Sequence, residues 1–115
     1  MMYPGIFAMV VGLGMIGHWM FSYLTKNIPE LEDEPIRIGF HVVAEMVTAL
    51  SLLVAGLGLL VGEDWAQPLY LVALGMLFYT AIVSPGYFAQ KGNWKWLGGF
   101  IALISAGLIA LAIVA

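Results

Sequence analysis

The sequence predicts an all-α integral membrane protein, a four-transmembrane-helix antiparallel bundle. Of its 115 residues, 63% are hydrophobic and only 10% are charged, whereas soluble domains are about half apolar and a quarter charged. Four apolar stretches each approach the roughly 20 residues that a helix needs to cross a bilayer. The few charges gather in short connecting segments. A soluble core could not hide this much apolar surface, so we expect the lipid bilayer to surround the chain.

The first predicted span is residues 3–25, which carries no formal charge and holds one titratable group in its apolar interior, His18. Its Gly12, Gly14 and Gly17 form a G-x-G-x-x-G sequence, the spacing of a dinucleotide fingerprint. That fingerprint requires a strand–turn–helix unit, and the polar segment KNIPELEDE that follows cannot supply the next strand. We therefore interpret the glycines as small residues that let another helix approach closely.

The second predicted span, residues 36–62, is the most informative part of the chain. Apart from Arg37 at its start, its only charge is Glu45, one turn after His41. A carboxylate inside a membrane costs about 2.5–3.5 kcal/mol on insertion scales, so such groups usually face protein or water and have a function. Pro35 is expected in the first turn of this helix, where a proline needs no hydrogen-bond donor.

The third and fourth predicted spans are residues 66–84 and 95–114. Pro85 and Gly86 follow the third span and are expected to end or kink its helix. Because the connecting segments are short, the sequence leaves no room for a separate soluble domain. We therefore expect residues 1–115 to form a single membrane domain.

The basic residues predict how the chain is oriented. Four spans place both termini on one side of the membrane, and all of the basic residues fall on the other side: Lys26, Arg37, Lys91 and Lys95. Short loops rich in lysine and arginine usually stay in the cytoplasm. The sequence therefore predicts cytoplasmic basic loops and external termini. The small net charge of −3 argues against nucleic acid as a partner.

The polar residues of the spans are predicted to meet in one layer. His18 and His41 each lie roughly 10 Å from the cytoplasmic ends of their helices, at 1.5 Å per residue. Glu45 lies one turn deeper on the face of His41, because residues four apart share a helix face. Four further polar residues are expected as a supporting layer. Thr48 continues the face of Glu45, Tyr79 and Thr80 lie at comparable depth, and Ser84 lies nearer the surface.

Several roles fit such a layer. His18, His41 and Glu45 are a suitable ligand set for a transition metal, and the two histidines could instead be axial ligands of haem b. Glu45 could also relay protons or cations with a histidine. The alternative without a ligand is an interhelical hydrogen bond, which is routine in membrane bundles. Our leading hypothesis is a membrane protein with a buried site for a metal, a haem or another small ligand.

Two hypotheses of other classes remain: an accessory subunit of a larger membrane complex, and a small proton-coupled transporter that works as an oligomer. The fourth span carries small residues at four-residue intervals, which could pack inside the bundle or against a second subunit: Gly98, Ala102, Ala106 and Ala110. An enzyme is less expected, because the spans contain no nucleophile motif and no carboxylate pair. The absence of cysteine excludes thiol catalysis and thiolate metal sites.

Overall fold

The computed structural model describes residues 2–25, 33–90, 92 and 94–115, leaving aside the side chains of residues 87–89. These residues form four helices and no strand: α1 (Met2–Leu24), α3 (Pro35–Val61), α4 (Ala66–Gln90) and α5 (Lys95–Val114). By length and composition, all four could cross a membrane. The sequence predicted four apolar helices at these places in the chain, and the structure confirms them.

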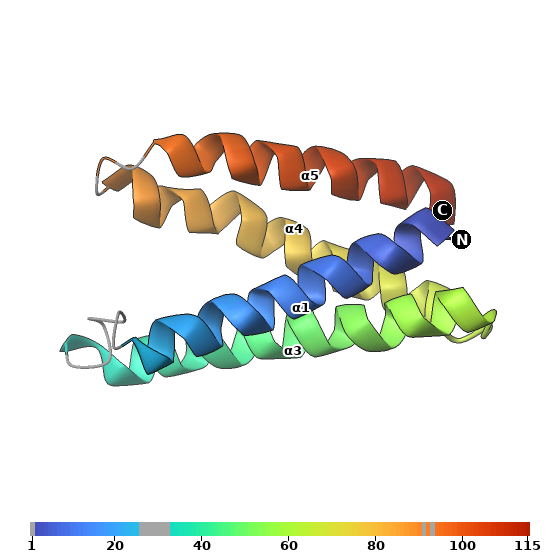
Figure 1. Ribbon diagram of the computed structural model, residues 1–115, viewed down its shortest axis with the longest axis horizontal. Helices are drawn as coiled ribbons and strands as arrows, with labels where there is room; N and C mark the ends of the chain where they lie inside the picture. Colours follow the sequence, from blue (N-terminus) through green and yellow to red (C-terminus); the bar gives the residue numbers. More distant parts are fainter. Residues whose placement is uncertain (1, 26–32, 91, 93) are drawn as a thin grey trace.

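The helices follow one another around the bundle in chain order. Helix α1 packs on α3, α3 on α4, α4 on α5, and α5 returns to α1. Figure 1 shows α1 and α3 as one pair and α4 and α5 as another. The two pairs approach each other at the end that carries both chain termini, and they diverge toward the opposite end. The contact between α3 and α4 joins the two pairs along the chain.

Most of the surface of the helices is apolar. Only 17% to 44% of the residues in the most apolar window of each helix are buried inside the protein. Large side chains such as Val10, Phe40, Val72 and Ile101 are exposed. Since water would penalise so much contiguous apolar surface, the outer faces of the helices are suited to contact with lipid.

Helices α1 and α3 approach each other through glycine and alanine. A Cβ atom on Gly12 would lie 2.9 Å from the carbonyl oxygen of Ala49, and one on Gly56 would lie 2.9 Å from the Cβ of Ala8. No side chain larger than hydrogen fits at either glycine without movement of the backbone. Close packing of small residues is the way in which membrane helices associate when lipid is as apolar as the helix surface.

The glycine-rich sequence of the first span is only partly used for packing. Gly12 contacts α3, but a Cβ atom on Gly14 or Gly17 would meet nothing within 4 Å. At 100° per residue, Gly14 and Gly17 point well away from the direction of Gly12. The close helix approach expected from the G-x-G-x-x-G spacing therefore occurs at its first glycine alone.

Hydrogen bonds tie the helices together at the end of the bundle that carries the termini. The buried hydroxyl of Tyr70 on α4 donates to the carbonyl of Pro4 on α1 at 2.7 Å. Gln67 donates to the carbonyl of Val114 at 2.8 Å. The Tyr3 hydroxyl donates to the carbonyl of Ala106 at 2.8 Å, which joins α1 to α5. Three helices are thus fixed to one another at this end.

Helix α3 ends in a left-handed turn that directs the chain into α4. Gly62 has a φ of 81°, a conformation that glycine adopts without a steric penalty. Its amide donates to the carbonyl of Leu59, and the amide of Glu63 donates to that of Gly58. This pair of bonds is the Schellman motif, which satisfies carbonyls at a helix end. The tight turn explains why α3 and α4 lie side by side.

Of the two effects expected of Pro85, an end or a kink of the third helix, the end is wrong. Helix α4 continues through Pro85 to Gln90, six residues beyond the predicted span of 66–84. A proline inside a helix removes one backbone hydrogen bond, whereas ending the helix at Ser84 would expose several unpaired backbone groups. In an apolar environment each such group costs several kcal/mol, so proline within a membrane helix is tolerated. At the start of α3, by contrast, Pro35 lies at the predicted N-terminal position.

Candidate functional site

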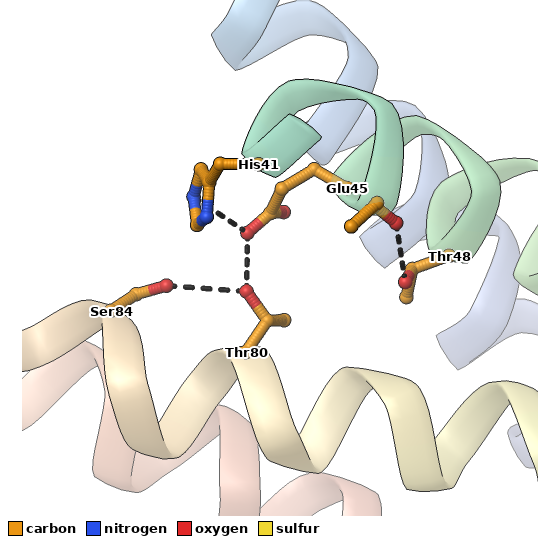
Figure 2. Close-up of polar contacts among 6 residues, drawn as sticks. His41, Glu45, Thr48, Thr80 and Ser84 are labelled. Carbon is orange, nitrogen blue, oxygen red and sulfur yellow. Dashed lines mark hydrogen bonds and ion pairs between the residues drawn. The ribbon is translucent and has the colours of Figure 1, made fainter. Parts of the chain in front are cut away.

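Glu45 is the central polar residue between α3 and α4. Its side chain is buried, and its Oε1 atom accepts a hydrogen bond from the hydroxyl of Thr80 on α4. Thr80 in turn lies 3.2 Å from the hydroxyl of Ser84, one turn further along α4. Figure 2 shows this chain of polar atoms crossing from one helix to the other. The carboxylate therefore joins α3 to α4 in the half of the bundle that lies away from the chain termini.

His41 extends the same chain on α3. Its Nε2 atom lies 3.5 Å from Oε1 of Glu45, one helix turn away. The two side chains differ in exposure, because 42% of the His41 side chain is accessible against 9% for Glu45. The carboxylate is thus covered by protein, while the imidazole faces the surface of the bundle. The i and i+4 spacing that suggested a shared face in the sequence brings these two residues together.

His18 does not join this cluster, which corrects the expected three-ligand site. Its imidazole is exposed on α1 and contacts the ring of Trp19, with ring centroids 5.5 Å apart. The α1 side chain that contacts His41 is Trp19, at 5.6 Å between ring centroids. Helix α1 is rotated so that the tryptophan, one residue further along, takes the place expected for His18.

With His18 outside the cluster, the structure lends no support to the predicted metal or haem site. Within the described residues, which include His18, His41 and Glu45, no three histidine or acidic side chains gather closely enough to hold a metal ion. The residues that the structure brings together are His41, Glu45, Thr80 and Ser84.

The other two predicted polar residues lie nearby in different roles. The hydroxyl of Thr48 is buried and donates to the carbonyl of Ala44 within its own helix, at 2.8 Å. Tyr79 is 72% exposed and lies next to Thr80 on α4. Neither makes a side-chain hydrogen bond to Glu45 in the described part of the chain. Thr48 and Tyr79 nevertheless line the same open space as Glu45.

That space is a groove between α3 and α4, with a volume of about 710 Å³. Its polar side chains are His41, Glu45, Thr48, Tyr79 and Thr80. The remaining lining residues are apolar or lack a side chain: Ala44, Val47, Leu71, Val72, Gly75, Met76 and Val83. Many of these side chains are exposed on the outer surface of the helices, so the groove opens toward the space that lipid would fill.

Three features of this groove were not predicted from the sequence. No role beside the groove was predicted for Trp19, although its ring contacts the imidazole of His41 edge-on. Gly75 was not predicted to line a site, although a Cβ at this position would meet nothing within 4 Å and would extend into the groove. The direct bond of Thr80 to Glu45 was also not foreseen. The available signal was the position of Thr80 along its span, which predicted a depth in the membrane comparable to that of Glu45.

The small residues of α5 form a strip that turns around the helix. Ala110 is buried and Ala106 is half-buried, but Ala102 and Gly98 are exposed. A four-residue interval advances by about 40° on a helix with 3.6 residues per turn, so the strip drifts away from the bundle interior. Among the glycines of α5, the one that packs closely is Gly107, where a Cβ atom would lie 2.6 Å from the ring of Phe78.

Comparison with known protein families provides a classification. A family model described as "Domain of unknown function (DUF8058)" matches residues 2–115. The chain belongs to the DUF8058 family. The DUF8058 match extends over all four helices and both walls of the groove. No curated protein and no solved structure matches the chain. The function of this DUF8058 protein must therefore be argued from the chemistry of the groove.

Proposed function

We propose that this protein binds a small amphipathic molecule from the bilayer, in the groove between α3 and α4. The observation that carries the proposal is a buried carboxylate, Glu45, at the floor of a groove whose walls are apolar. An ionisable group at membrane depth is costly and is by default a candidate for function. His41 and Thr80 hold this carboxylate in one position, which suits recognition of a ligand headgroup.

The size and composition of the groove support a ligand of moderate size. Sites for small molecules usually have volumes of about 300–1,000 Å³ and combine apolar walls with a few polar groups. A volume of about 710 Å³ lies within that range. Val47, Leu71 and Val72 would contact an alkyl chain, and the polar residues near Glu45 would contact the headgroup. The ligand would enter sideways from the lipid.

A photolabelling experiment tests this proposal. We expect a photoactivatable long-chain alcohol, added to the protein in lipid nanodiscs, to label the segments 41–48 and 71–83. Replacing Gly75 with phenylalanine should reduce this labelling at least fivefold, because the new ring would occupy open space in the groove. Labelling would be mapped by mass spectrometry of peptides.

The matched control is Gly14→Phe. It places the same ring at an exposed helical glycine on α1, where a Cβ atom also meets nothing, and it should leave labelling of the groove unchanged. Labelling spread evenly over all four helices, or labelling of the groove that persists in Gly75→Phe, would contradict the proposed function.

The proposed orientation in the membrane has the basic loops in the cytoplasm and both termini outside. It is supported by the short-loop rule for lysine and arginine and by the described basic residues. Arg37 lies in the first turn of α3 and Lys95 begins α5, at the end of the bundle opposite to the termini. A reporter active only in the cytoplasm should be silent at either terminus and active when inserted between α4 and α5. Activity at a terminus would reverse the orientation.

A further inference from the structure

We infer that the groove selects a ligand with a cationic, hydrogen-bond-donating headgroup, that is, a lipophilic amine in its ammonium form. This inference rests on the proposed function and specifies the ligand class. It is drawn from the hydrogen bonds of Glu45, from the charges around it and from the residues that line the groove.

The first argument concerns the free oxygen of Glu45. Its Oε1 atom accepts the bond from Thr80 and faces His41, while no described side chain or amide donates to Oε2. Every fully buried side-chain nitrogen or oxygen in the described residues has a partner. The Oε2 atom is therefore accessible, and the groove is the space that Glu45 lines. An ionised carboxylate only accepts hydrogen bonds, so its complement is a donor.

The second argument concerns charge. No lysine or arginine lines the groove. Of the described basic residues near this end of the bundle, Arg37 is exposed and paired with Glu34 at 2.7 Å. The histidine at 3.5 Å is thus the one group in the groove that can offset the charge of Glu45. An alcohol and an ammonium can both donate to a carboxylate, but only the ammonium adds the Coulomb attraction of opposite charges, which is strong where water is excluded. An ammonium headgroup would therefore bind more tightly than an alcohol, and a carboxylate headgroup would be repelled.

The third argument concerns the surroundings of the headgroup and tail. Tyr79 lines the groove beside Thr80 and is exposed, and the face of a tyrosine ring attracts cations. The apolar walls formed by Val47, Leu71 and Val83 would bind the alkyl chain. A headgroup at Glu45 with its chain along these walls uses both the polar and the apolar parts of the groove.

Competition with three probes of equal chain length tests the inference. Dodecylamine, 1-dodecanol and dodecanoate would compete with the photoactivatable alcohol in nanodiscs of phosphatidylcholine, a zwitterionic lipid with no net charge. We expect dodecylamine to displace the label at a concentration at least tenfold lower than 1-dodecanol, and dodecanoate to be the weakest competitor. The alcohol controls for burial of the alkyl chain, since only the headgroup differs.

Two variants test whether the preference for dodecylamine depends on Glu45. Glu45→Gln retains an acceptor for Thr80 but removes the charge, so dodecylamine and 1-dodecanol should then compete within about twofold of each other. Glu34→Gln makes the same change at an exposed position outside the groove and should preserve the tenfold difference.

The outcomes separate the two proposals. Equal competition by amine and alcohol in the unmodified protein would overturn the cationic selectivity while leaving the groove as a ligand site. A preference for the amine that persists in Glu45→Gln would also overturn it. Labelling by the alcohol that is not confined to the groove would contradict the proposed function itself.

Discussion

Replacing Gly12 with valine is expected to destabilise the protein by about 1–3 kcal/mol, the usual cost of forcing extra atoms into a close-packed interface. A Cβ atom at this position would lie 2.9 Å from the backbone oxygen of Ala49. Since the obstacle is backbone, α1 and α3 would have to move apart. The free energy of unfolding can be measured by titration with a denaturing detergent in mixed micelles.

Gly14→Val and Gly17→Val are the matched controls for this prediction. They introduce the same side chain two and five residues further along α1, where a Cβ atom meets nothing within 4 Å. Because glycine is a poorer helix former than valine, these variants should be neutral or slightly more stable. If Gly12→Val were no less stable than the two controls, the packing of α1 on α3 would be wrong.

Replacing Thr80 with valine is expected to cost about 1–2 kcal/mol. The substitution keeps the shape of the side chain but removes the hydroxyl that donates to Glu45. Loss of one partner leaves a buried acceptor unsatisfied, which costs about 1–3 kcal/mol in proteins. Interhelical bonds in membranes average about 0.6 kcal/mol, and the charge on the acceptor raises our expectation above that mean.

Thr48→Val is the matched control, because Thr48 is also buried beside the groove. Its hydroxyl bonds to the carbonyl of Ala44 in the same helix and joins no other element. This substitution should change the free energy of unfolding by less than about 0.5 kcal/mol. Equal losses in the two variants would indicate that the bond between Thr80 and Glu45 contributes nothing specific.

The four helices could be predicted from the sequence because hydropathy and length alone determine a membrane helix. The boundaries at Pro35 and Gly62 followed from residues with strong local preferences. For Pro85, the expectation of an end or a kink included an end because the rule that proline ends a helix comes from water, where exposed backbone groups are satisfied by solvent. In lipid the continuous helix is favoured despite the missing bond.

For the candidate site, the sequence could predict which residues share a face of one helix, and a common depth for Thr80 of the next, but not how α1 is rotated. The spacing of His41 and Glu45 fixes their shared face whatever the rotation of α3. Whether His18 or Trp19 of α1 faces His41 depends on how α1 is rotated. In a soluble bundle an apolar stripe would reveal that rotation, but here the outer face is as apolar as the inner one. The small residues of α1 indicate its rotation instead, since Gly12 marks the face that packs on α3.

The central claim is that the carboxylate of Glu45 connects α3 to α4 through Thr80 at the floor of the groove. A double-mutant cycle tests it most directly, with Glu45→Leu, Thr80→Val and the combined variant compared by the free energy of unfolding. We predict a coupling energy of about 1 kcal/mol, because residues in one hydrogen-bond network are not additive. A coupling energy indistinguishable from zero would show that the two side chains act independently and would contradict the site described above.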